Sequence, residues 1–178
     1  MRRRSVLLAV AVLAAGLLVA SLAGAAGGKK NLKADELTGY QENPDISTVA
    51  TGSFQITIDD DAREFTYELS YSGLEGTVSQ AHIHFGKRAV NGGVTVFLCG
   101  TAGSPGPAGT PVCPQSGTVT RTVAASDILA PGTQGIEAGN YEELVAAMRA
   151  GNTYANIHST KWPGGEIRAQ INDRANNN

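Results

Sequence analysis

The sequence predicts an all-β protein, a β-sandwich or Greek-key barrel of about eight strands with one short helix. Apolar and polar residues alternate along most of the chain, which is the pattern of strands that bury one face. The 22 glycines and 7 prolines indicate many turns. Only one segment has the spacing of an amphipathic helix.

The first 25 residues have the features of a secretory signal peptide. Three arginines at positions 2–4 precede an unbroken apolar run at 6–19, and Ala23-Gly24-Ala25 fits the small-x-small pattern before a cleavage site. We expect residues 1–25 to be removed, which predicts a secreted, periplasmic or cell-wall-associated protein. The alternative is a retained membrane anchor, because the apolar run approaches the ~20 residues that span a bilayer.

The remainder has the length of one domain. Residues 26–33 are small and polar and are predicted to be a linker. The domain is predicted to span 34–172, and the polar residues 173–178 to form a disordered tail. Cleavage leaves 11 basic against 16 acidic residues, and this negative charge argues against nucleic-acid binding. We expect no membrane association after cleavage, and an unidentified extracellular protein or surface ligand as partner.

Structure is predicted to begin near Ala34, with a first short strand that ends in a turn-rich loop at 37–44. The runs 49–58 and 65–71 alternate on either side of a polar turn, which predicts a β-hairpin. A strand at 77–85 follows, and 94–99 is apolar on both faces, so it should lie deep in the core. The apolar residues that share a face in the hairpin are Phe54, Ile56, Ile58, Phe65, Tyr67, Leu69 and Tyr71.

After a further strand at 117–123, the chain has its only predicted helix. Asn140 is a suitable N-cap for residues 141–150, two acidic residues stand in the first turn, and Gly151 ends the helix. Two more strands, 154–159 and 166–171, complete the domain. The residues predicted to form the inner face of the helix are Tyr141, Leu144, Val145 and Met148.

The chain has two cysteines, Cys99 and Cys113. In an exported protein we expect them to form a disulfide, because the segment between them has few apolar residues with which to order itself. Closing a loop of roughly 15 residues contributes about 3 kcal/mol in the chain-entropy model. Free thiols are the alternative, and the spacing matches no common zinc motif.

The three histidines are the sharpest functional signal. His82 and His84 share one face of a predicted strand, and His158 lies on the polar face of another. If these strands are neighbours, the imidazoles converge and form a candidate site for one copper or zinc ion. No other cofactor is expected.

The alternative interpretation of the histidines is structural: they hydrogen-bond Asn156, Ser159 or Glu166 and hold the sheet together. No catalytic residue is predicted, since the chain has no Gly-x-Ser-x-Gly elbow, phosphate-binding loop or zincin motif. The residues expected to form a polar patch around the imidazoles in either case are Tyr154, Asn156, Glu166 and Arg168.

Three motifs in this order resemble the chordin-type (CHRD) domain, in the form found in secreted bacterial proteins. They are LTGYQENP at 37–44, AHIHFG at 81–86, and YANIHS at 154–159 leading to PGGEIRAQ at 163–170. The resemblance implies an exported binding or structural module, extracellular or periplasmic, with an unknown ligand. In animals such domains occur in chordin, an extracellular antagonist of bone morphogenetic proteins, and that role does not transfer to a single domain.

A second, local resemblance is to the His-x-His strand of copper/zinc superoxide dismutase. That enzyme needs more ligands than three histidines supply, so the full site cannot form here. The alternative function is therefore a single-site copper or zinc protein, or an oxidoreductase with one metal.

Overall fold

The computed structural model describes residues 29–34 and 36–172 and contains nine strands and one α-helix in these ranges. The predicted signal peptide and C-terminal tail lie outside the described residues. The helix is α1 (Tyr141–Arg149). The strands are β1 (Lys30–Ala34), β2 (Leu37–Thr38), β3 (Thr51–Asp59), β4 (Glu64–Ser72), β5 (Val78–Phe85), β6 (Gly93–Gly100), β7 (Gly117–Ala124), β8 (Thr153–Ser159) and β9 (Ile167–Asn172).

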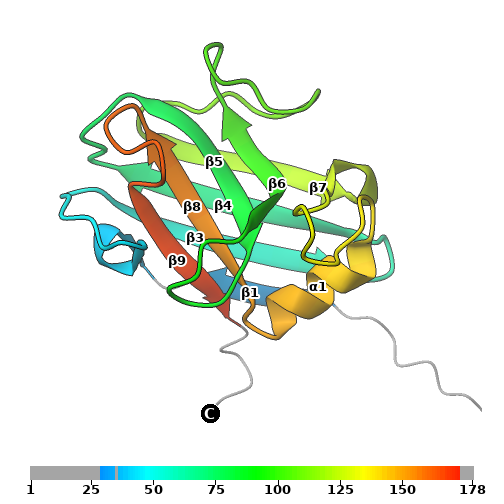
Figure 1. Cartoon of the computed structure of the whole chain (residues 1–178). Coiled ribbons are helices and arrows are strands. Elements are labelled where there is room, and N and C mark those ends of the chain that lie inside the picture. Colours follow the sequence, from blue (N-terminus) through cyan, green and yellow to red (C-terminus); the bar gives the residue numbers. More distant parts are fainter. Residues whose placement is uncertain (1–28, 35, 173–178) are drawn as a thin grey trace, which may run out of the picture.

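The strands form one antiparallel sheet in the order β6-β5-β8-β9-β1-β3-β4-β7, and β2 pairs with both β3 and β9. The sheet folds over so that β5, β6, β8 and β9 lie in front of β3, β4 and β7 (Figure 1). The hydroxyl of Tyr67 on β4 donates to the carbonyl of Leu98 on β6, which joins the two layers. The end strands β6 and β7 do not pair in the described sheet, so the fold is a sandwich and not a closed barrel.

The core lies between the layers and follows the predicted alternation. In the β3–β4 hairpin, Phe54 stands opposite Leu69 and Ile56 opposite Tyr67, and all four are at most 2% exposed. The facing layer contributes the inner side chains of β5, β6, β8 and β9. Those that are fully buried include Ala81, Ile83, Val96, Leu98, Ala155, Ile157, Ile167, Ala169 and Ile171.

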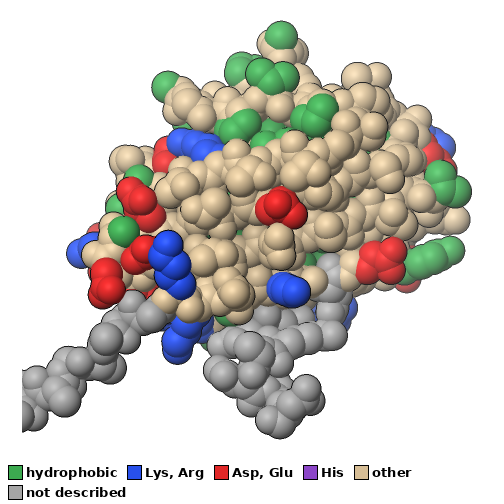
Figure 2. Space-filling model, turned by 180° about the vertical axis from the view of Figure 1, so that it is seen from behind, with side chains coloured by type: hydrophobic (Ala, Val, Ile, Leu, Met, Phe, Trp, Pro, Cys, Tyr) green, Lys and Arg blue, Asp and Glu red, His purple; other side chains and the backbone are tan. Residues whose placement is uncertain are grey.

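The back of the sandwich is a polar surface. Seen from behind, most of the face over β3, β4 and β7 carries neither charged nor apolar side chains (Figure 2). Its hydroxyl groups pair across strands, with 2.8 Å between Thr66 and Thr122 and 2.7 Å between Ser70 and Thr118. No histidine is visible on this face. The imidazoles belong to β5 and β8 in the other layer.

The predicted linker at 26–33 is wrong for its last residues, because β1 begins at Lys30. This strand pairs with β3 on one side and β9 on the other, and Leu32 is 1% exposed. Leu32 is the only apolar residue from Lys30 to Lys33, so no alternation is visible in the sequence. The strand forms because its backbone hydrogen-bonds to β3 on one side and to β9 on the other.

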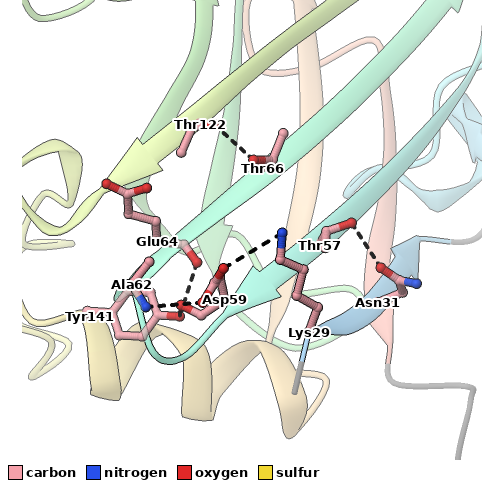
Figure 3. Close-up of polar contacts among 9 residues, drawn as sticks. All are labelled: Lys29, Asn31, Thr57, Asp59, Ala62, Glu64, Thr66, Thr122 and Tyr141. Atoms are coloured by element: carbon pink, nitrogen blue, oxygen red, sulfur yellow. Dashed lines mark hydrogen bonds and ion pairs between the residues drawn. The ribbon is translucent and has the colours of Figure 1, made fainter. Parts of the chain in front are cut away.

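The helix α1 is confirmed and covers one end of the sandwich (Figure 1). Asn140 caps it by accepting a hydrogen bond from the amide of Glu143 at 3.2 Å. The hydroxyl of Tyr141 donates to the carbonyls of Asp59 and Glu64, which ties α1 to the tip of the β3–β4 hairpin (Figure 3). No helix in the described ranges is long and apolar enough to cross a membrane.

The predicted disulfide between Cys99 and Cys113 is confirmed. Both residues are at most 5% exposed, and the bond closes the loop after β6. The amide of Cys113 also donates to the carbonyl of Gly100 at 2.8 Å. The covalent bond and this hydrogen bond therefore fix the base of a loop that has few core contacts of its own.

Candidate metal centre

The three imidazoles lie together on the outer face of the β5–β8 pair. His82 and His84 alternate on β5, and His158 on β8 stands opposite Gln80 in the antiparallel register. Its ring is therefore diagonal to His82, with centroids 4.9 Å apart. The candidate ligand atoms of the three residues all lie within 4.8 Å of one another.

Backbone carbonyls determine the tautomer of two rings. His84 Nδ1 is 2.9 Å from the carbonyl oxygen of Gly92, and His158 Nδ1 is 3.0 Å from that of Pro163. A carbonyl only accepts, so in both rings Nδ1 carries the hydrogen. In the neutral imidazoles Nε2 therefore has a free lone pair, which is the state in which histidine binds a metal.

The third ring completes the arrangement. His82 Nδ1 is 3.1 Å from His158 Nε2. Because that Nε2 is an acceptor, His82 must donate through Nδ1, which leaves its own Nε2 without a hydrogen. The Nε2 atoms of His82 and His84 are both buried and make no hydrogen bond. Two unpaired buried acceptors in one small cluster are unusual in a folded protein and require an explanation.

The spacing approaches that of ligands around one ion. Two nitrogens bound at 2.0–2.1 Å to a tetrahedral ion are about 3.3 Å apart. His82 Nδ1 and His158 Nε2 are 3.1 Å apart, but a hydrogen on Nδ1 joins them, so His82 would have to release this hydrogen or turn its ring before both residues bind one ion. The largest separation in the group, up to 4.8 Å, requires at least one ring to turn before all three nitrogens reach a shared ion. The fourth coordination position would remain open, as in catalytic zinc sites.

Burial keeps the imidazoles neutral. His82 and His84 are 4% and 8% exposed. Burial lowers the pKa of His84 to about 4, and burial followed by the charges of the other two histidines holds the pKa of His82 far below its ordinary value. Burial also lowers the pKa of His158. At neutral pH all three rings therefore offer lone pairs and carry no charge.

Aromatic side chains form the walls of the cluster. The edge of the His82 ring meets Phe97 on β6, with centroids 4.4 Å apart. The His84 ring stacks on Tyr154 with centroids 4.8 Å apart and an angle of 2° between the planes. His158 is the least buried of the three histidines, so solvent reaches the cluster from its side.

The four residues of the predicted polar patch are buried, at 0–3% exposure, and do not form a surface. Loops cover them: Arg168 donates to the carbonyls of Lys87 and Val90, and Glu166 accepts from Thr48 at 2.9 Å. The structural alternative is not found in the predicted form. None of the imidazoles hydrogen-bonds Asn156, Ser159 or Glu166 among the described residues, and their partners are one another and two carbonyls.

Sequence reasoning missed Glu42. This residue is 6% exposed and accepts a hydrogen bond from Asn156 at 2.6 Å. Burial raises its pKa to about 7, against the lowering effects of Asn156 and Arg168. Its position in the first CHRD-like motif was the available signal, but a loop glutamate gives no sign of burial. Gly92 and Phe97 were missed for the same reason, since their contacts depend on how loops and neighbouring strands pack.

Comparison with known proteins gives one match. The family model described as "CHRD domain" matches residues 34–171. No curated protein and no solved structure matches this chain. All three histidines, both cysteines and Glu42 fall inside the matched range.

Proposed function

This chain belongs to the CHRD domain family, a small extracellular type of module, and we propose that it binds one copper or zinc ion through His82, His84 and His158. The observation that carries the proposal is the pair of buried, unpaired Nε2 atoms beside a third imidazole. A bound ion would give these lone pairs the partner that no described side chain or backbone group supplies.

The type of ligand limits which metals could bind. The cluster contains neutral imidazoles only, without thiolate or carboxylate among its three members. Imidazole suits zinc and copper, whereas magnesium and calcium prefer oxygen ligands. The carbonyls of Gly92 and Pro163 would accept the Nδ1 hydrogens of His84 and His158, and so hold both rings in the tautomer whose Nε2 can bind a metal.

The proposal includes export. The disulfide and the family support a protein outside the reducing cytosol, and we infer that residues 1–25 are cleaved near Ala25. N-terminal sequencing of the exported protein should begin close to Ala26, and a retained Met1 would contradict the inference. The metal site would then belong to an extracellular or periplasmic binding or structural module.

The decisive experiment is elemental analysis of protein purified without a histidine tag, since a tag would itself bind the metal. After chelation and dialysis against zinc or copper(II), the wild type should hold one ion per chain. The His84→Gln variant keeps a polar side chain of similar size but loses the ring nitrogen, so it should hold none.

A matched control is Gln80→Ala, which changes the residue directly opposite His158 without removing an imidazole. It should keep one ion per chain. Circular dichroism verifies that each variant retains its strands. A wild type that holds no ion after loading, or a fully loaded His84→Gln variant, would refute the metal site.

A further inference from the structure

We propose that Arg168 is a positioning residue for the metal site, which acts through Tyr154 and the loop at 86–92 to hold His84 in its binding orientation. The inference rests on the proposed function, because His84 is one of the three proposed ligands. The charge of Arg168 helps to lower the pKa of His84, but its hydrogen bonds and its ring contact are with the loop and with Tyr154, so these groups carry any effect on the orientation of the imidazole.

The first connection is a stack of three side chains. The guanidinium carbon of Arg168 lies 3.6 Å from the centre of the Tyr154 ring, which is a close cation–π contact. The Tyr154 ring stacks in parallel on the His84 ring, with centroids 4.8 Å apart. Tyr154 stands opposite His84 in the β5–β8 register, so the backbone places the Tyr154 ring over the His84 ring. The guanidinium of Arg168 contacts the Tyr154 ring and restricts its movement.

The second connection runs through the loop. Arg168 Nη2 donates to the carbonyls of Lys87 at 3.3 Å and Val90 at 3.1 Å, and Nη1 donates to Asn91 Oδ1 at 3.2 Å. One guanidinium therefore hydrogen-bonds three residues of the loop. A lysine could not reproduce this fork of donors.

The loop ends at the residue that determines the His84 tautomer. The carbonyl of Gly92 accepts from His84 Nδ1, and its amide donates to the Tyr154 hydroxyl at 3.1 Å. A side chain on Gly92 would place its Cβ only 1.7 Å from the carbonyl oxygen of Phe85, so the loop packs directly on the end of β5. Arg168 thus contacts Tyr154, which stacks on the His84 ring, and the loop that leads to Gly92, which accepts a hydrogen bond from that ring.

Stability alone is a weak reason for this arginine. Arg168 is 2% exposed, and a buried guanidinium loses its hydration. Glu42 attracts it electrostatically, but replacement of buried charged groups by well-packed apolar side chains is often neutral or stabilising in other proteins. A role in orienting His84 accounts for its placement between the ring stack and the loop.

The test uses Arg168→Met and nitrogen NMR of the histidine side chains in the metal-free protein. The wild type should show His84 as a single tautomer with the hydrogen on Nδ1, and Arg168→Met should show a mixture of tautomers. Affinity for zinc, measured by competition with a chelator dye, should fall about 10- to 100-fold, which is typical when a residue that orients a metal ligand is lost. Arg168→Lys should restore part of the zinc affinity.

The matched control is Arg121→Met, which removes an arginine from β7 that pairs with Asp127 at 2.6 Å on another part of the sandwich. It should leave the His84 tautomer and zinc affinity unchanged. If Arg168→Met does not fold, Tyr154→Leu and Asn91→Ala each remove one connection, and both should shift the tautomer.

The two proposals fail separately. If the wild type binds no metal, the proposed function is wrong, and the tautomer measurement still decides the role of Arg168. If the folded Arg168→Met protein keeps a single His84 tautomer and full zinc affinity, the positioning role is refuted. The same holds if Arg121→Met produces an equal change, because the effect would then be a general loss of stability.

Discussion

Glu42 is a carboxyl group that the fold removes from water. Burial raises its pKa from 4.5 to about 7. Between these pH values the folded protein binds the proton more tightly than the unfolded chain, so the contribution of Glu42 to the free energy of unfolding falls as pH rises. The full pKa difference corresponds to about 3 kcal/mol in the free energy of unfolding.

The histidines have lowered pKa values and act in the opposite direction. Their contribution to the free energy of unfolding is lost as pH falls below about 6.5.

The Glu42→Gln variant isolates this effect, because the histidine contribution is present in both proteins. We expect the free energy of unfolding of the variant, relative to wild type, to rise by up to about 3 kcal/mol between pH 4.5 and pH 8. Urea unfolding at several pH values measures it. Glu68→Gln is the control, since it makes the same substitution at an exposed position on β4. A difference for Glu42→Gln that does not depend on pH would contradict the burial argument.

At the scale of elements, the disulfide closes a loop in which no residue from 101 to 112 is buried. Cys99 and Cys113 are 14 residues apart, and only the ends of the loop continue the sheet through the Gly100–Val112 bridge. We expect Cys99→Ser to lower the free energy of unfolding by roughly 2–4 kcal/mol while the protein stays rich in strands. Urea unfolding and circular dichroism measure both quantities, and Ser104→Ala within the loop is the control. A change below about 0.5 kcal/mol in Cys99→Ser would show that the bond is dispensable.

Sequence reasoning succeeded for elements that carry their own pattern. The β3–β4 hairpin alternates, and α1 has a cap, an apolar stripe and a terminal glycine, so their periodicity was sufficient. The same rule placed His82 and His84 on one face and His158 on the polar face of its strand, but their convergence also required β5 and β8 to be neighbours, which the structure shows. The burial of Arg168 and Glu166 could not be predicted in this way, since it depends on loops from distant parts of the chain that fold over β8 and β9.

At the scale of the whole molecule, β1 joins the two layers. In the sheet it stands between β9 of one layer and β3 of the other, beside the two-residue strand β2, which makes the same connection. The histidine strands β5 and β8 belong to the layer on one side of this junction. The layer that carries the candidate metal centre is therefore joined to the other layer by a segment whose sequence resembles a linker.

Leu32 tests how much β1 contributes to stability, because it is the one fully buried side chain of this strand, beside the partly buried Ala34. We expect Leu32→Ala to lower the free energy of unfolding by about 2–5 kcal/mol, the range for a buried leucine that leaves a cavity. Lys33→Ala, at the exposed neighbouring position, should change it by less than about 0.5 kcal/mol. Urea unfolding of both variants gives the comparison. Equal effects of the two substitutions would contradict this expectation. They would mean that β1 stabilises the fold through its backbone pairing with β3 and β9 and not through the Leu32 side chain.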